Sequence, residues 1–325
     1  MRTPRSAPAP HRGDGAARPL PRGAGPPKAA GDAGGGARTS VVIATRDRRD
    51  ELLETLDRLA ALPERPPVVV VDNGSADGTP AAVRAAFPRT DVVALGRNRG
   101  AVARNVGVLR ARTRYVAFCD DDSWWEPGAL DRAADAFDAC PALGLLAART
   151  LVGERAETDP VSTAMAASPL RDRDGVPGTP VLGFLACSAV VRRDAFLSVG
   201  GFSELLFFAG EESVVAFDLA AAGWLLRYRP DVLAHHRPSP ARPPARSRLA
   251  LQRRNALLSA WLRRPVRTAL AATGALAGEA VRDPASRAAL AAAAARLPAA
   301  LLARRRLPAP VEHDLRILAA AEPPA

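Results

Sequence analysis

Three consecutive aspartates, Asp120, Asp121 and Asp122, follow the apolar run Tyr115–Cys119. The apolar run is short and rich in β-forming residues, which predicts a buried strand. On an extended backbone, side chains two residues apart point to the same side, so we expect Asp120 and Asp122 to project together. Two carboxylates held this close repel each other unless a cation lies between them, and oxygen ligands favour Mg²⁺ or Mn²⁺. Such an ion is suited to binding a diphosphate. An acidic turn that caps the next helix is the alternative.

The positive charge of the chain is concentrated in its terminal segments. The 325 residues carry a formal net charge of +11, whereas residues 39–236 hold 22 basic and 27 acidic residues. A mildly acidic central region argues against a nucleic-acid-binding domain, so no nucleic-acid partner is expected.

The cysteines and the apolar segments bear on the cellular compartment. Cys119, Cys140 and Cys187 are far apart and form no Cys-x-x-Cys motif, so neither a disulfide framework nor a zinc site is expected. The N-terminal segment contains arginines but no apolar core of a signal peptide. No apolar stretch reaches about 18 residues without a charge or proline. We expect a cytoplasmic protein that does not span a membrane, with a peripheral position at the inner face of the plasma membrane left open.

Short apolar strands alternate with helices in the first part of the central region. Strands are expected at residues 40–44, 68–71, 91–95 and 115–119, and helices at 50–62, 79–87 and 101–112. This alternation predicts an α/β fold whose central sheet is mostly parallel and covered by helices on both faces. Ligands bind such sheets beyond the carboxyl ends of the strands. Polar clusters lie at those ends, namely residues 45–47, residues 72–75 and the aspartates.

The rest of the chain divides into less regular parts. We expect a helix at 128–139, a strand at 143–148, a long irregular segment at 153–180 that would cover the site, and two short strands at 225–228 and 232–234. Three domains follow: a disordered Pro/Gly/Arg-rich tail at 1–38, a catalytic domain at 39–240 and a basic helical extension at 241–325. We expect the extension to pack against the central domain. Binding to an anionic membrane surface is the alternative.

Five motifs, in this order and spacing, resemble those of the family 2 glycosyltransferases with the GT-A (Rossmann-like) fold, including rhamnosyltransferase- and galactosyltransferase-like bacterial members. The matching segments are Val41–Arg48, Val69–Thr79, Asn98–Gly107, the aspartate triplet and Gly200–Glu212. The resemblance covers roughly residues 39–240 and, more loosely, the segment Arg253-Arg254-Asn255 after them. It implies a metal-dependent inverting glycosyltransferase that uses Mn²⁺ or Mg²⁺ and moves a sugar from a UDP-, GDP- or dTDP-sugar to an acceptor hydroxyl. The implied acceptor is a glycan, a lipid or a small molecule, as in cell-envelope glycans, glycolipids or natural products.

The resemblance also implies roles for individual residues. Glu212, the second residue of the acidic pair Glu211-Glu212, would be the general base that takes the proton from the acceptor hydroxyl, although the choice between the two neighbours is open. The metal ligands would be Asp120, Asp122 and His235, with His236 as the alternative to His235. The nucleotide-sugar-binding residues would be Thr45, Arg46, Asp72, Asn98, Arg104, Asp120 and Asp121.

Two further observations come from the residues themselves. Asp72 is followed by Asn73-Gly74, a turn that lets the backbone approach a ligand closely. Trp124 and Trp125 flank the predicted site, and their aromatic faces could pack against an acceptor sugar. Core packing is the alternative for both tryptophans.

Two other functions remain to be weighed. A sugar nucleotidyltransferase normally has a glycine-rich, lysine-containing phosphate loop, but residues 44–50 contain no glycine and the central region contains no lysine. A non-catalytic nucleotide-sugar-binding protein docked at a membrane surface would not need the complete acidic set. A dinucleotide oxidoreductase is disfavoured because no Gly-x-Gly-x-x-Gly motif follows the first strand.

Overall fold

The computed structural model describes residues 36–172, 175–239 and 245–321. The tail predicted at residues 1–38 therefore lies almost wholly outside the described residues.

The first part of the central region alternates strands and helices as the sequence predicts, with bounds within two residues of those expected. The elements are β1 (Thr39–Thr45), α1 (Arg49–Ala60), β2 (Val68–Asp72), α2 (Thr79–Ala86), β3 (Asp91–Ala94), α3 (Val102–Arg110) and β4 (Tyr115–Cys119).

The second part of the central region is more irregular than the first. Its elements are β5 (Ser123–Trp125), α4 (Ala129–Ala139), β6 (Leu143–Val152), β7 (Glu157–Thr158), α5 (Pro160–Ala166), β8 (Thr179–Pro180), the 3₁₀ turn η1 (Ala186–Ser188), β9 (Ala189–Arg192), α6 (Arg193–Ser198), α7 (Glu212–Ala221) and β10 (Leu225–His236).

Two expectations for this part need correction. The two strands expected at residues 225–228 and 232–234 are a single strand, β10, because a register shift between Arg229 and Leu233 absorbs the intervening Pro230-Asp231-Val232. The segment at 153–180 was expected to be irregular throughout, yet it contains β7, α5 and β8.

The strands form one mixed sheet in the order β3-β2-β1-β4-β9-β6-β10-β5, with β7 and β8 attached to β6 and β10. The first four strands of this order are mutually parallel, and β6 and β10 are parallel to each other. β9 is antiparallel to β4 and to β6, so β6 and β10 run in the same direction as β4. The predicted α/β fold is confirmed, and the carboxyl ends of β1, β2, β4, β6 and β10 lie at one edge of the sheet.

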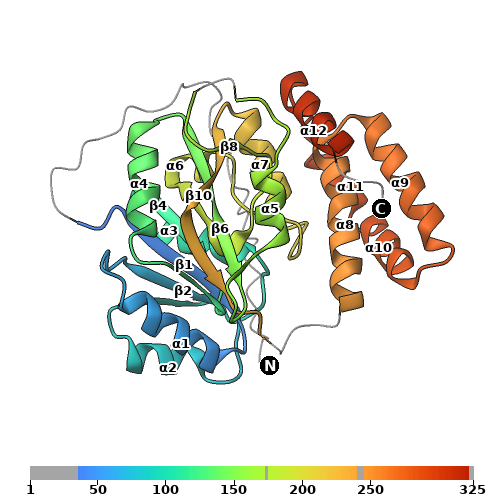
Figure 1. Cartoon of the computed structure of the whole chain (residues 1–325). Coiled ribbons are helices and arrows are strands. Elements are labelled where there is room, and N and C mark those ends of the chain that lie inside the picture. The colour runs from blue at the N-terminus through green and yellow to red at the C-terminus, as the bar shows by residue number, and fades with distance from the viewer. Residues whose placement is uncertain (1–35, 173–174, 240–244, 322–325) are drawn as a thin grey trace, which may run out of the picture. The chain divides into compact units, whose positions relative to one another are not determined.

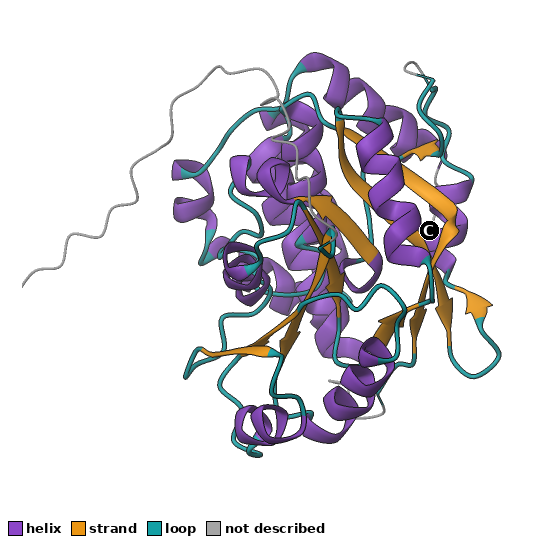
Figure 2. Cartoon of the chain, turned by 90° about the vertical axis from the view of Figure 1, so that its left-hand side faces the viewer, coloured by secondary structure: helices purple, strands orange, loops and turns teal. Residues whose placement is uncertain are grey.

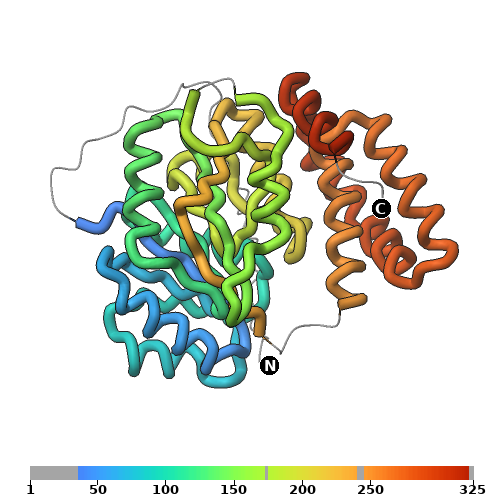
Figure 3. Tube along the Cα trace, viewed as in Figure 1, coloured from blue at the N-terminus to red at the C-terminus, as the bar shows by residue number. Residues whose placement is uncertain are grey.

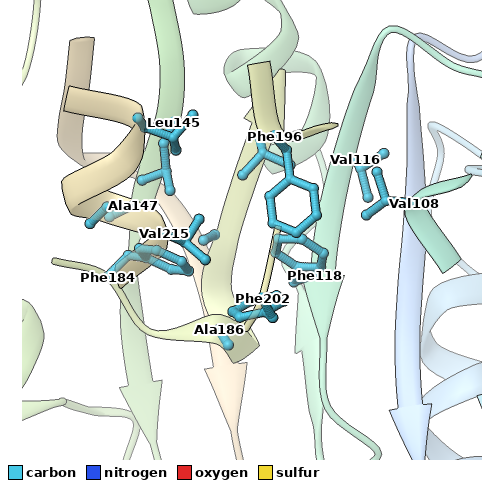
Figure 4. Close-up of a cluster of buried hydrophobic side chains, with 14 of the residues drawn as sticks. Val108, Val116, Phe118, Leu145, Ala147, Phe184, Ala186, Phe196, Phe202 and Val215 are labelled. Atoms are coloured by element: carbon cyan, nitrogen blue, oxygen red, sulfur yellow. The ribbon is translucent and has the colours of Figure 1, made fainter. Parts of the chain in front are cut away.

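Helices cover both faces of this sheet (Figure 2). Alternate residues of each strand belong to opposite hydrophobic clusters, as a pleated strand requires. In β1, for example, Val42 packs in one cluster and Val41 and Ile43 in the other. Figure 4 shows part of the first cluster, where Phe118, Phe196 and Phe202 pack with ring centroids 5.4–5.6 Å apart.

Five helices follow the sheet: α8 (Ala245–Arg263), α9 (Val266–Ala280), α10 (Pro284–Ala294), α11 (Leu297–Leu302) and α12 (Ala309–Ala321). Their course is shown in orange and red in Figures 1 and 3. Leu257, Leu258 and Leu262 of α8 pack with Leu206 and Val214 of the central region. The guanidinium of Arg263 donates to Asp218 of α7 at 2.8 Å. Among the described residues, no helix combines the length and apolarity that crossing a membrane requires.

Candidate active site

A cavity of about 960 Å³ opens at the carboxyl edge of the sheet. Its walls include the acidic and basic residues on which the sequence analysis focused, namely Asp120, Asp122, Glu211, Glu212, Arg104 and His236. These residues come from four separate motifs, and the fold brings them together.

The aspartate triplet forms a turn. β4 ends at Cys119, the N–H of Asp120 donates to Ser123 Oγ at 2.8 Å, and the N–H of Ser123 donates to the carbonyl oxygen of Asp120 at 3.3 Å. The expected extended backbone is therefore wrong for Asp120–Asp122. Asp120 and Asp122 still line the same cavity, but each carboxylate has different partners.

Asp121 is turned toward the first strand and the loop after it. Its carboxylate accepts hydrogen bonds from the hydroxyl of Thr45 and from Arg48, both at 2.9 Å. This carboxylate thus ties the aspartate turn to the end of β1.

Asp122 lies beside His236. The antiparallel pairing of β5 with β10 places His236 opposite Ser123, and this register leaves His236 Nε2 3.3 Å from Asp122 Oδ1. The N–H of Ser239 donates to Asp122 Oδ2 at 3.0 Å. Burial by itself would raise the pKa of Asp122, but the hydrogen bonds from His236 and Ser239 lower it to about 2. Asp122 is therefore ionised at neutral pH.

His235 points elsewhere, because adjacent residues of a strand face opposite sides. Its Nε2 lies 3.1 Å from Glu126 Oε2. Its ring is stacked on Trp124, with centroids 5.3 Å apart and planes at 4°. Of the two histidines, it is His236 that lies next to the aspartates.

The two tryptophans lie outside the walls of the large cavity. Trp124 is held between the ring of His235 and the guanidinium of Arg58, whose central carbon lies 3.8 Å from the ring centroid. Trp125 is 1% exposed and belongs to the second hydrophobic cluster. The structure thus gives Trp125 a place in the core, away from any surface that an acceptor could reach.

The residues implied for nucleotide binding surround the ends of β1 and β2. Asp72 is buried, and its Oδ2 accepts hydrogen bonds from the N–H groups of Gly74 and Ser75, both at 3.1 Å. Its Oδ1 has no hydrogen-bond partner among the described residues. Arg46 is half exposed and pairs with Asp47. Asn98 accepts a hydrogen bond from the N–H of Gly100 at 2.9 Å and so shapes the turn before α3.

Arg104 connects the aspartate turn to the acidic pair. Its side chain is 4% exposed, donates a hydrogen bond to Asp120 and lies 3.8 Å from Glu211 Oε1. Burial acts to lower the pKa of Arg104, but Asp120 and Glu211 outweigh it and raise the pKa. The guanidinium therefore remains charged between two carboxylates.

The acidic pair begins α7. Glu211 is buried, while Glu212 is partly exposed, and both line the cavity. Burial and the neighbouring Glu212 raise the pKa of Glu211 to about 8, against the opposing effect of Arg104. Burial also raises the pKa of Glu212, although backbone N–H groups, including that of Ala186, partly oppose the shift. Raised carboxyl pKa values are typical of proton-transfer sites.

The loop that carries the acidic pair is held by side chains and backbone from two directions. Asn255 of α8 is fully buried, and its Nδ2 donates to the carbonyl oxygens of Leu206, Phe208 and Ala209 at 2.9, 2.8 and 2.7 Å. On the other side, the N–H of Ala101 donates to the carbonyl oxygen of Phe207 at 2.6 Å. The sequence analysis included Asn255 only in the looser part of the family resemblance and assigned it no role, because nothing in the sequence places α8 beside this loop.

Comparison with known proteins identifies the family. The sequence profile described as "Glycosyl transferase family 2" matches residues 40–200. An N-acetylglucosaminyl-diphospho-decaprenol L-rhamnosyltransferase of Mycobacterium tuberculosis is 30% identical over 276 residues, which cover 71% of this chain and 88% of that protein. The chain belongs to glycosyl transferase family 2 and is a glycosyltransferase. Family membership decides against the sugar nucleotidyltransferase and non-catalytic alternatives.

Other proteins are similar over smaller shares or at lower identity. A pre-mycofactocin glycosyltransferase of Mycobacterium tuberculosis is 30% identical over 203 residues, which cover 61% of this chain and 42% of that protein. A mannosyltransferase from Pyrobaculum calidifontis, solved in complex with GDP-Man and Mn²⁺, superposes with a TM-score of 0.53 at 22% identity and covers 88% of this chain and 76% of that chain. TarS 1-349 of S. aureus with UDP-GlcNAc gives a TM-score of 0.54 at 18% identity over 68% and 66% of the two chains. The structural neighbours support the GT-A fold predicted from the sequence.

Proposed function

We propose that this glycosyltransferase is metal-dependent and inverts the anomeric configuration of the sugar that it transfers. The observation that carries the proposal is a single cavity that holds the Asp122–His236 pair at one wall and the acidic pair Glu211-Glu212 at another. An electrophile and a base within one cavity are what a direct displacement needs.

The side chains around Asp122 fit a divalent cation. Within the part of the chain that the structure describes, no group of three or more His, Cys, Asp or Glu side chains could hold a metal ion by itself. Mg²⁺ and similar ions are commonly held by one or two protein ligands together with substrate phosphates and waters. Asp122 and His236, with their facing atoms 3.3 Å apart, are the ligands that we propose, in place of His235. When bound, Mn²⁺ or Mg²⁺ supplies positive charge that neutralises the departing diphosphate.

We assign the general base to Glu212. It is the more exposed member of the pair and stands at the first residue of α7. Glu211 is buried against Arg104, which suits a supporting role. In the proposed displacement, the acceptor oxygen forms a bond to the anomeric carbon, Glu212 takes the proton of that oxygen, and the bond from the anomeric carbon to the diphosphate oxygen breaks.

The donor nucleotide is proposed to lie over the ends of β1 and β2. The buried Oδ1 of Asp72 has no hydrogen-bond partner within the described part of the chain. It suits a hydrogen bond from a base N–H or a ribose hydroxyl, because a buried acceptor without a partner is costly. Thr45, Arg46 and Asn98 lie around the same strand ends. Asp121 and Asp120 would then act mainly through their contacts to Thr45 and Arg104.

The other proposals concern location and acceptor. Nucleotide-sugar use is consistent with a cytoplasmic site. The basic C-terminal helices are proposed to contact an anionic membrane surface, where a lipid-linked or cell-envelope acceptor would be presented. The name of the Mycobacterium tuberculosis rhamnosyltransferase, which refers to a decaprenol-linked substrate, is consistent with such an acceptor.

A donor screen tests the proposed function. Purified protein is incubated with UDP-, GDP- and dTDP-sugars and Mn²⁺, and the anomeric configuration of the transferred or hydrolysed sugar is read by NMR before mutarotation. We expect release of nucleoside diphosphate from at least one donor, with inversion of configuration. Retention of configuration would contradict the assigned role of Glu212.

A further inference from the structure

The cavity extends beyond the charged residues into a part with apolar walls. We call this part the apolar arm, and its lining includes Val161, Ala164, Met165, Val181, Phe217 and Leu318. The charged residues and the apolar arm belong to one continuous cavity. A ligand that reacts beside Glu212 can therefore extend into the arm.

One wall of the apolar arm is a face of the short helix α5. Val161, Ala164 and Met165 are spaced three and four residues apart, which places them on the same side of the helix. Asp159 fixes the start of this helix by accepting a hydrogen bond from the N–H of Val161 at 2.7 Å. Val161 is 43% exposed, so the helix presents apolar surface to the cavity.

Another wall of the apolar arm comes from the last helix of the extension. Leu315, Leu318 and Ala319 of α12 share one face, and all three line the cavity. Leu315 and Leu318 also pack with Leu182 and Phe217 of the central region. The arm is thus formed jointly by the glycosyltransferase domain and its helical extension.

The apolar side chains exposed in the cavity indicate what occupies the arm. Phe208, three residues before Glu211, is 45% exposed and lines the same cavity. Large apolar side chains exposed in a concave site mark a ligand-binding surface. A nucleotide or a sugar ring would leave its hydroxyl groups unpaired against these walls, which is unfavourable. The arm is therefore suited to hydrocarbon.

The cavity is also lined by a positively charged side chain, that of Arg248, to which the proposed mechanism assigns no role. Arg248 and Gln252, one turn apart on α8, line the cavity, and no ion pair or hydrogen bond joins Arg248 to another described residue. A guanidinium in this position complements a phosphate.

We propose that the apolar arm binds the hydrocarbon chain of an amphiphilic acceptor, whose polar head carries the attacking hydroxyl to Glu212 and whose linking phosphate pairs with Arg248. This inference rests on the proposed function, because it takes the acceptor hydroxyl to lie beside Glu212. It assigns acceptor selection to the helical extension, since α8 supplies the cation and α12 one wall of the arm.

Chain-length dependence of binding tests the inference. Dodecyl phosphate, kept below its micellar concentration, butyl phosphate and inorganic phosphate are each titrated into the full chain by calorimetry with UDP and Mn²⁺ present. We expect dodecyl phosphate to bind at least tenfold more tightly than butyl phosphate, and inorganic phosphate to bind most weakly. Equal affinity for the two alkyl phosphates would overturn the proposal.

Substitutions then locate the binding. Ala164→Trp fills the arm, and Val161→Asp places a charge in it; both positions are exposed, so the fold should tolerate them. Each substitution is expected to lower the affinity for dodecyl phosphate at least tenfold. Arg248→Ala is expected to lower the affinities for dodecyl phosphate and butyl phosphate by the same factor. Leu302→Asp, at an apolar residue that is 91% exposed and outside the cavity walls, is the control and should change nothing. Loss of binding in Leu302→Asp but not in Ala164→Trp would assign binding to the outer surface and reject the arm.

Nucleotide binding separates this inference from the proposed function. Mn²⁺-dependent binding of UDP, GDP and dTDP is measured for each variant, and we expect the same affinities as for the unchanged chain. If no nucleoside diphosphate binds, the proposed function fails. If one binds but alkyl chain length has no effect, only the apolar arm is rejected.

Discussion

At the level of single residues, the carboxylates of the site differ in their surroundings, although Arg48 contacts both Asp121 and Asp122 and Arg104 lies between Asp120 and Glu211. Asp122 is kept ionised by His236 and the N–H of Ser239. The acidic pair at the start of α7 has the opposite environment, since burial favours its protonated form. Carboxylates close together in one cavity are thereby prepared for different roles, one to hold a cation and one to accept a proton.

The raised pKa values of the acidic pair predict how activity depends on pH. Burial raises the pKa of Glu212, and it raises the pKa of the neighbouring Glu211 to about 8. A base must be deprotonated to accept the acceptor proton, so these two interacting carboxyl groups delay full activity to higher pH. We expect the rate of transfer to rise between pH 6 and pH 8 instead of levelling off near pH 5. Glu212→Gln should lower kcat by about 10²–10⁴-fold and abolish this rise.

The pH profile is measured with one donor at saturating concentration, and nucleoside diphosphate binding is the control. Glu212→Gln should bind the nucleotide as the unchanged chain does, because Glu212 is not among its proposed contacts. A flat profile from pH 5 to pH 8 with full activity would show that the base lies elsewhere.

At the scale of elements, the loop before α7 depends on two segments that are distant in sequence. Asn255 holds it from α8 through three carbonyl oxygens, and the turn before α3 holds it through Phe207. Phe207 and Ala209 both have positive φ angles, 65° and 68°, a conformation that non-glycine residues adopt only under constraint. The hydrogen bonds from Asn255 and Ala101 to this loop hold its backbone in that conformation.

Asn255 is accordingly predicted to position the base. Asn255→Asp keeps the shape of the side chain but replaces its donor with a charged acceptor facing three carbonyl oxygens. We expect a loss of kcat of about 10²-fold with unchanged Mn²⁺-dependent nucleotide binding, and a smaller loss for Asn255→Ala. Ala256→Ser, at the next and exposed residue of α8, serves as the control. An Asn255→Asp variant with normal kcat would show that the loop holds its conformation without α8.

A residue without a side chain is predicted to be required at position 100, because Gly100 packs against the loop before α7. A Cβ added to Gly100 would lie 2.2 Å from the carbonyl oxygen of Phe207, whereas one added to Gly96 meets no atom within 4 Å. Both glycines have similar positive φ angles, 61° and 66°, so they share the cost of the left-handed conformation. Gly100→Ala should therefore lower the free energy of unfolding by about 1–3 kcal/mol more than Gly96→Ala, as measured by urea denaturation. Equal losses would show that the loop moves away without cost.

Local sequence signals were sufficient for the regular part of the fold. Continuous β-branched runs such as Val68–Val71 predicted the strands. The order of the motifs predicted that the acidic pair and the aspartates belong to the site. What the sequence could not supply were contacts set by register and by distant packing. The pairing of β10 with β5 decides that His236 lies beside Asp122. The turn at Asp120 directs Asp120 toward Arg104, whereas Asp121 and Asp122 both contact Arg48. Likewise, tertiary packing places Trp125 in the core.

At the scale of the whole molecule, charge and apolar exposure concentrate in the helical extension. Residues 237–325 carry 16 basic and 5 acidic residues. Val266, Leu270, Val281 and Leu302 are 51–91% exposed there. Exposed apolar residues among arginines are typical of surfaces that bind anionic membranes.

Membrane binding of the whole chain is predicted to depend on this extension. The double variant Val281→Asp with Leu302→Asp should co-sediment with anionic vesicles several-fold less than the unchanged chain, and added salt should weaken binding of both. Leu109→Asp, at a residue of α3 that is 62% exposed, is the matched control. Equal partitioning of the double variant and the unchanged chain would remove the membrane proposal.

Asp122 and His236 are proposed to hold a divalent cation against the donor diphosphate. The most direct measurement is the initial rate of donor cleavage with Mn²⁺, and again after EDTA treatment, for the unchanged chain, Asp122→Asn, His236→Ala and the control His235→Ala. We predict that EDTA and Asp122→Asn each abolish cleavage, that His236→Ala lowers Mn²⁺ affinity about 10–100-fold, and that His235→Ala changes the rate little. Full activity of Asp122→Asn, or of the unchanged chain without a divalent ion, would contradict the claim.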